Sequence, residues 1–186
     1  MSYFGAGLWH CGAALAFAAA LGLLEHGDAL SRLRDPLFVC ALVVSSCALF
    51  PIPQAFARRG LWKFLHYPLP DWDVLLLGIA SHRHWVSHSA WLPLLLAASK
   101  YLQPQFWAAY PLAASPALGL CLGLGSHLLW DLAGSRSHTI VVIPHAWTLR
   151  AATSRAWLLV GALLCLASAV CFSDLKLARA WLAQWL

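Results

Sequence analysis

The most informative shortage in this 186-residue chain is that of charge. Asp, Glu, Lys and Arg make up 10% of the sequence, against roughly 25% in soluble globular proteins. Hydrophobic residues make up 61%, and a soluble fold of this size could not bury that much apolar surface. The composition therefore excludes an ordinary soluble domain and favours a protein that is solvated largely by a lipid bilayer.

Three further features are missing. None of the six cysteines forms a C-x-x-C pair and all lie in apolar runs, so we interpret them as buried thiols. The N-terminus lacks the basic region and cleavage site of a signal peptide, so we expect its first apolar run to be a retained span. The net charge of +5 forms no basic stripe, which predicts contact with anionic lipids and no nucleic-acid partner.

Several apolar runs approach the length of about 20 residues that a membrane-spanning helix needs. They are Gly7–Leu24, Leu37–Pro53, Tyr110–Leu132 and Ala156–Phe172. We interpret Asp71–Leu102 as one further span with a break, because polar interruptions are tolerated where they face protein or a water-filled cavity. The tail Ser173–Leu186 has the pattern of an interfacial amphipathic helix.

The expected fold is therefore an all-α polytopic bundle in a single domain covering residues 1–186. About five transmembrane helices are predicted, one of them interrupted around a histidine cluster. Five antiparallel crossings place the N-terminus, the 54–70 loop and the 133–154 loop on one side of the membrane. That side holds seven Lys and Arg residues against five on the other, which favours a cytoplasmic location for it.

The segment SHRHWVSHS, residues Ser81–Ser89, carries three histidines and an arginine. On a continuous helix His84 and His88 share a face, whereas His82 lies roughly 120° away from His88. Either His84 and His88 form a ligand pair on such a helix, or a break brings His82 to His88. Arg83 cannot ligate a cation, but it could hold a phosphate or carboxylate of a substrate.

Two other segments add carboxylates. His127 and Asp131 are four residues apart in an apolar run, which places both on one face of a helix. Asp71 and Asp73 follow a proline and open another apolar run. Close carboxylates repel unless a cation lies between them, and a divalent metal would serve that purpose.

The resulting donor set combines imidazoles and carboxylates without thiolates. The candidate metal ligands are His10, Asp71, Asp73, His82, His88, His127 and Asp131, and the candidate catalytic residues are His84 and Arg83. Such a set favours Zn²⁺ first, with Mn²⁺, Fe²⁺ or Mg²⁺ as the other options. It exceeds the four ligands of a structural zinc, which favours one or two ions with open positions for water.

These segments resemble the YdjM-like family of predicted inner-membrane metal-dependent hydrolases. Members carry an LPDxD segment, an HRGxTHS-like segment, a GxxxHxxxD helix and a histidine near the N-terminus. The matching positions are Leu69–Asp73, His82–Ser89, Gly123–Asp131 and His10. The second segment is one residue longer here between its first and last histidines. The resemblance therefore leaves both His82 and His84 as candidates for the one family ligand. The resemblance spans most of residues 7–144.

The resemblance implies a metal-dependent hydrolase in the inner membrane. The family is also distantly similar to zinc-dependent phospholipase C-type enzymes, which favours a phosphoester substrate. We therefore expect hydrolysis of a lipid or lipid-linked phosphoester by a metal-activated water, with membrane lipids as partners. The alternative is a non-enzymatic metal-binding membrane protein. A transporter would need a polar path to both faces, and a metal-stapled scaffold would need a closed ligand shell.

Overall fold

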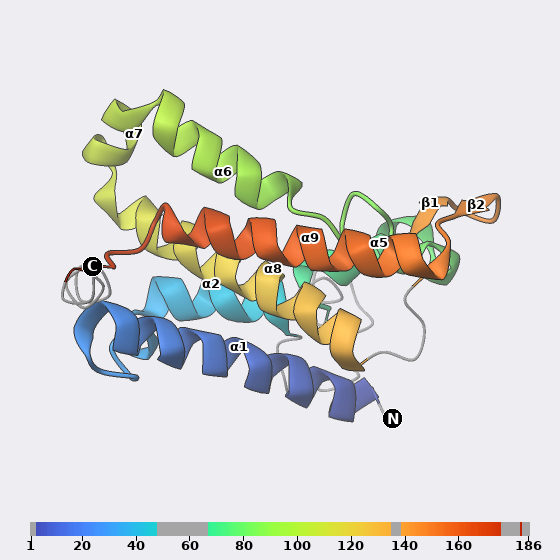
Figure 1. Ribbon diagram of the computed structural model, residues 1–186, viewed down its shortest axis with the longest axis horizontal. Coiled ribbons are helices and arrows are strands. Elements are labelled where there is room, and N and C mark those ends of the chain that lie inside the picture. Colours follow the sequence, from blue (N-terminus) through green and yellow to red (C-terminus); the bar gives the residue numbers. More distant parts are fainter. Residues whose placement is uncertain (1–2, 48–66, 135–138, 176–182, 184–186) are drawn as a thin grey trace.

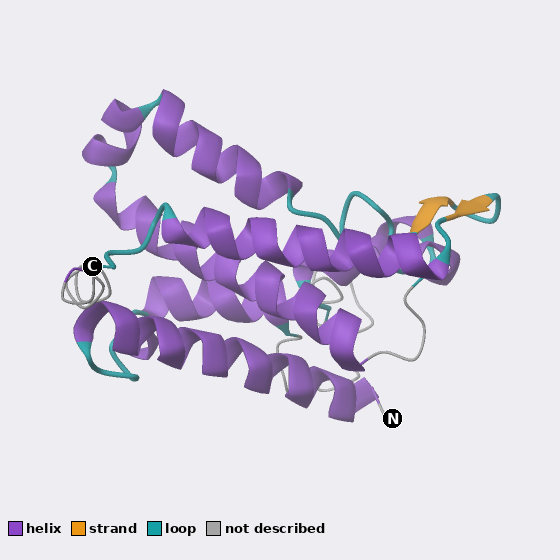
Figure 2. Ribbon diagram, viewed as in Figure 1, coloured by secondary structure: helices purple, strands orange, loops and turns teal. Residues whose placement is uncertain are grey.

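A computed structural model describes residues 3–47, 67–134, 139–175 and 183. Within these ranges the chain is mostly helical, which confirms the all-α prediction apart from one short hairpin (Figures 1 and 2). The α-helices are α1 (Tyr3–His26), α2 (Pro36–Ser46), α5 (Trp72–Leu77), α6 (Trp91–Leu102), α7 (Pro104–Ala109), α8 (Ala114–Gly134) and α9 (Ala151–Val170). Strands β1 (Val141–Ile143) and β2 (Trp147–Thr148) pair in antiparallel orientation.

Helix α8 is the centre of the fold. It contacts α1, α2, α6 and α9, and Figure 1 shows α1, α2 and α9 running alongside it. Its Leu118 and Leu128 are fully buried, in two neighbouring apolar clusters. A helix that is apolar on nearly every face is one that other helices surround, and this central position holds His127 and Asp131 inside the protein.

Two glycines on α8 let α2 approach closely. A Cβ atom at Gly119 would overlap the carbonyl oxygen of Phe38, and one at Gly123 would overlap the hydroxyl of Ser45. Small residues four positions apart permit this kind of close helix contact within membranes. The contact matters for function because it brings the C-terminal end of α2, at Ser46, against His127 on α8.

We expect Gly123→Ala to destabilise the protein by about 1–3 kcal/mol, because the added methyl must displace backbone of α2. Gly12→Ala is the matched control. It lies on an exposed part of α1, and apart from neighbouring residues of α1 itself no described atom lies within 4 Å of the position that the added methyl would take. That change should stabilise the helix by up to about 1 kcal/mol through helix propensity. Thermal unfolding in detergent would measure both changes in stability. A change of the same sign in both variants would contradict the close contact at Gly123.

Two of the described helices are long and apolar enough to cross a membrane. They are the segment Pro111–Ala133, which includes most of α8, and α9. These coincide with the predicted spans Tyr110–Leu132 and Ala156–Phe172. Only 39% of the apolar window of α9 is buried, so many of its apolar side chains face outward rather than into a core.

The other predicted spans agree with the structure to different extents. Helix α1 covers Gly7–Leu24, but α2 ends at Ser46 after 11 residues and so covers only part of Leu37–Pro53. The stretch Asp71–Leu102 is interrupted around the histidines, as predicted, but neither of its helices is among the candidate spans. It divides into the six-residue α5, a loop, and the 12-residue α6, each too short to cross a bilayer.

About five crossings are therefore not confirmed, since two candidate spans are found among the described residues. Most of the predicted amphipathic tail, Ser173–Leu186, lies outside the described residues, as do residues 54–66 of the predicted 54–70 loop.

Candidate metal centre

The histidine-rich segment is a loop whose shape is set by distant parts of the chain. The amide of Trp85 donates to the carbonyl of Val141 at 2.9 Å, and the amide of Val141 donates to the carbonyl of Arg83 at 3.0 Å. From α9, the indole N–H of Trp157 donates to the carbonyl of His88 at 2.8 Å. Arg83 itself has a φ of 64°, a left-handed conformation that is unfavourable for a side chain of this size.

This loop brings His82 to His88, as the interrupted alternative requires. Their ring centroids are 5.9 Å apart. Their Nε2 atoms lie 3.2 Å and 3.5 Å, respectively, from Oδ1 of Asp71. Asp71, His82 and His88 thus form one group whose ligand atoms could surround a single ion.

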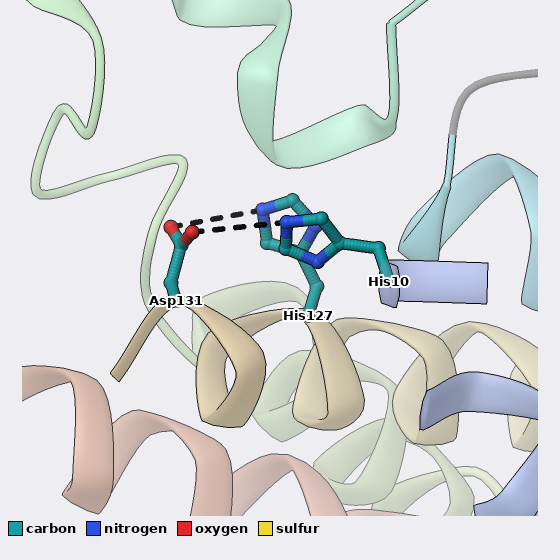
Figure 3. A group of neighbouring side chains, drawn as sticks. All are labelled: His10, His127 and Asp131. Atoms are coloured by element: carbon teal, nitrogen blue, oxygen red, sulfur yellow. Dashed lines mark ion pairs between the residues drawn. The ribbon is translucent and has the colours of Figure 1, made fainter. Parts of the chain in front are cut away.

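A second group joins the first apolar helix to the central one. His10 on α1 and His127 on α8 stack at 4.2 Å between ring centroids, and both face Asp131 (Figure 3). The distance from Nε2 to a carboxylate oxygen of Asp131 is 3.8 Å for His10 and 3.9 Å for His127. These three residues could also hold a metal ion.

The two groups are continuous with each other. Nε2 of His88 lies 3.4 Å from Oδ2 of Asp131, and Nε2 of His127 lies 3.9 Å from Oδ1 of Asp71. A tetrahedral zinc with bonds of 2.0–2.1 Å holds neighbouring ligand atoms about 3.4 Å apart. The observed separations are near this value, and several are too long for hydrogen bonds. The spacing therefore suits ligands arranged around cations.

The other ring nitrogens of His88 and His127 are already engaged. Nδ1 of His127 lies 3.1 Å from the carbonyl oxygen of Ser46, which can only accept, so Nδ1 carries the proton. Nδ1 of His88 lies 3.1 Å from the hydroxyl of Ser87 and 3.4 Å from Oδ2 of Asp73. Metal-binding histidines typically donate their second N–H to a carbonyl or carboxylate in this way.

The Nε2 atoms of the same two rings are buried and have no hydrogen-bond partner in the part of the chain that the structure describes. His88 is fully buried and His127 is 1% exposed. Unpartnered polar atoms at such depth are rare because they are costly. In the neutral ring that carries its proton on Nδ1, Nε2 has the lone pair that a metal ion requires, and both Nε2 atoms face carboxylates.

The cluster is rich in negative charge. Asp71, Asp73 and Asp131 lie around it, and Arg83 is the permanent cation that contacts it among the described residues. Burial alone would raise the pKa of the Asp71 carboxyl, but the neighbouring imidazoles of His82 and His88 hold it well below its usual range. His88 lies outside the two candidate spans. Burial alone would lower its pKa, but the surrounding carboxylates raise it. The pocket therefore favours positive charge.

Asp73 faces the Nδ1 side of the His88 ring, whereas Asp71 faces its Nε2 side. Oδ2 of Asp73 accepts hydrogen bonds from the amide of His84 at 2.8 Å and the hydroxyl of Ser87 at 2.7 Å. It faces Nδ1 of His88 and belongs to neither group of possible ligands. The side chain of Asp71 caps no amide of α5 in the described chain, so helix capping does not explain that residue.

The two residues that we considered catalytic also have distinct positions. Arg83 donates to both carboxylate oxygens of Asp131, at 3.0 Å and 3.3 Å. His84 belongs to neither group and lines an apolar cavity beside them. Sequence reasoning did not identify Ser46 and Trp157. Ser46 acts through its backbone carbonyl, for which side-chain identity gives no signal.

None of the known protein families, curated proteins or solved structures that we compared with this chain matches it. The resemblance to the YdjM-like family therefore remains a prediction. The functional interpretation of the cluster depends on the positions and chemistry of its own side chains.

Proposed function

We propose that this chain is a membrane-embedded, metal-dependent hydrolase that cleaves a phosphoester of a lipid or lipid-linked substrate. One observation carries the proposal: the buried, unpartnered Nε2 atoms of His88 and His127 converge on the carboxylates of Asp71 and Asp131. A buried His–Asp cluster with a purely structural role would be expected to pair these atoms in hydrogen bonds. Lone pairs and carboxylates turned toward a common centre instead suit bound cations.

The residues present fit one or two divalent ions. Asp71, His82 and His88 would hold one, and His10, His127 and Asp131 would hold the other. The imidazole and carboxylate donors favour Zn²⁺ first, then Mn²⁺, Fe²⁺ or Mg²⁺. When bound, such ions lower the pKa of a coordinated water toward neutrality and offset the negative charge of a phosphoryl group.

Neighbouring residues would hold these ligands in place. Asp73 and the carbonyl of Ser46 would orient His88 and His127, so we assign Asp73 to positioning rather than to the ligand set. Arg83, which we expected to bind substrate, would first of all position Asp131 through its two hydrogen bonds. Its charge would also favour an anionic substrate nearby.

The cluster is closed on one side and open on the other, as an enzyme requires. His88 and His127 are buried, whereas the side chains of His82 and Asp71 are 39% and 17% exposed. A substrate could therefore reach the ligands from the side of His82 and Asp71. A metal-stapled scaffold would be expected to close this side with a further protein ligand.

The membrane location is part of the proposal. It is supported by the two helices that are long and apolar enough to cross a bilayer, and by large exposed apolar side chains on α9. Val160 and Leu163, for example, are 53% and 55% exposed. A bundle of about five crossings in the inner membrane, with the cluster toward the cytoplasm, would extend this arrangement.

The proposal is tested with the purified chain in detergent. Elemental analysis is expected to find about one or two divalent ions per chain. Hydrolysis of long-chain phosphatidic acid or a phosphodiester phospholipid should stop with chelator and return when Zn²⁺ or Mn²⁺ is added. A chain without retained metal would refute the site. Retained metal without hydrolysis of any lipid phosphoester would favour the non-enzymatic alternative, and metal flux into proteoliposomes would identify a transporter.

A further inference from the structure

An apolar cavity of about 410 Å³ lies beside the candidate metal centre. Its apolar walls include Leu76 and Leu77 of α5, Leu92 of α6 and Leu124 of α8. Asp73 and Ser87 also line it, and these are two of the residues that surround Nδ1 of His88. The volume is at the lower end of the range for small-molecule pockets, which suits one extended chain better than a bulky ligand.

The mouth of the cavity is apolar as well as its walls. Leu76, Leu77 and Leu92 are 67%, 53% and 40% exposed, so three of the lining leucines reach the protein surface. A water-soluble substrate would lose hydration in such a cavity without gaining hydrogen bonds along most of its length. A hydrocarbon chain has no such cost and could enter sideways from a bilayer.

The polar end of the cavity adjoins the residues that position the proposed ligand His88. Oδ2 of Asp73 accepts from Ser87 and from the amide of His84, and lies 3.4 Å from Nδ1 of His88. Its other oxygen, Oδ1, is buried and has no hydrogen-bond partner among the residues described. The cavity therefore has polar groups where it meets the cluster and mostly apolar side chains elsewhere.

Building on the proposed function, we infer that this cavity binds one hydrocarbon chain of a membrane phospholipid. The leucines of α5, α6 and α8 hold the chain, and the polar end directs the phosphoester toward the His/Asp cluster. His84, which lines the cavity outside the ligand groups, is placed to contact the head group. The substrate class is thereby narrowed to lipids with at least one long chain.

The experiment uses the whole chain in detergent micelles and phosphatidic acid carrying a photoactivatable diazirine on one acyl chain. In the wild type we expect label on peptides from α5, α6 or α8 that line the cavity. Leu92→Trp fills the cavity and should lower this labelling at least about tenfold, since each excluded methylene weakens binding by about fourfold. Leu76→Trp fills it from α5 and should act in the same way.

Leu95→Trp is the matched control. Leu95 is on the same helix and 66% exposed, but it is not part of the lining, so its labelling should stay within about twofold of wild type. Unchanged metal content in Leu92→Trp and Leu76→Trp would show that both remain folded. Equal labelling in these variants and in Leu95→Trp, or label outside the cavity in the wild type, would overturn the inference.

Labelling does not require hydrolysis, so the inference and the proposed function can fail separately. Labelling that depends on the cavity in a chain without phosphoesterase activity would support the lipid site and refute the enzyme. Hydrolysis of lipid phosphoesters together with labelling that is unchanged in Leu92→Trp and Leu76→Trp would support the enzyme and refute the lipid site.

Discussion

His127→Ala is expected to remove bound metal and hydrolytic activity together. His127 is a buried imidazole of the second group that also faces the first, since its Nε2 lies 3.9 Å from carboxylate oxygens of both Asp71 and Asp131. Its Nδ1 donates to the carbonyl of Ser46, so Nε2 is the ring nitrogen left to bind a metal ion. Loss of an outer hydrogen-bond partner alone typically costs 10–100-fold in metal affinity, so loss of a ligand should exceed about 100-fold.

Elemental analysis and a lipid phosphoester assay on the same preparation would measure this effect. His26→Ala is the matched control, because His26 ends α1 with a side chain that is 48% exposed and belongs to neither group. It should retain metal and activity. Full metal content in His127→Ala would rule out a ligand role for this residue. Loss of both in His26→Ala would show that the assay reports instability instead.

Asp71→Asn should affect metal binding far more than Asp73→Asn does. Oδ1 of Asp71 faces three imidazole Nε2 atoms, those of His82, His88 and His127, at 3.2–3.9 Å. Removing its charge removes a ligand, and we expect affinity to fall by more than about 100-fold. Asp73 contacts His88 only on the Nδ1 side, so its loss should weaken affinity by about 10–100-fold.

Titration of the metal-free proteins with Zn²⁺ would separate the two cases. Excess metal should restore activity to Asp73→Asn but not to Asp71→Asn. Both changes preserve side-chain shape, and Asp28→Asn, with a side chain 41% exposed, controls for loss of one carboxylate elsewhere. The reverse order of effects would exchange the roles that we assign to the two aspartates.

The composition of the chain predicts where its helices lie better than it predicts how many times the chain crosses the membrane. Apolar runs of sufficient length indicated α8 and α9, because hydrophobicity summed over 20 residues is a strong signal. The same signal gave Leu37–Pro53 more helix than the described residues show, since α2 starts at Pro36 and ends after 11 residues. It also treated α5 and α6 as two parts of one interrupted span, whereas each is too short to cross a bilayer. An apolar run does not specify where a helix ends when tertiary contacts end it.

The residue types of the site were visible in the sequence, and so was one of its local geometries. His127 and Asp131 are four apart on α8, which alone puts them on one face. The choice between His82 and His84 was not visible. It depends on hydrogen bonds from Val141 and Trp157, which are more than 50 residues away along the chain.

The sequence by itself determined that the chain is helical, strongly apolar and equipped with imidazole and carboxylate donors but no paired thiolates. Tertiary structure decided which donors meet. A left-handed Arg83 and a loop pinned by β1 and α9 turn His82 and His88 toward Asp71, while Asp73 faces the other nitrogen of His88. The physical reason is that side-chain chemistry is local, whereas the direction of a side chain in a loop is set by hydrogen bonds to distant segments.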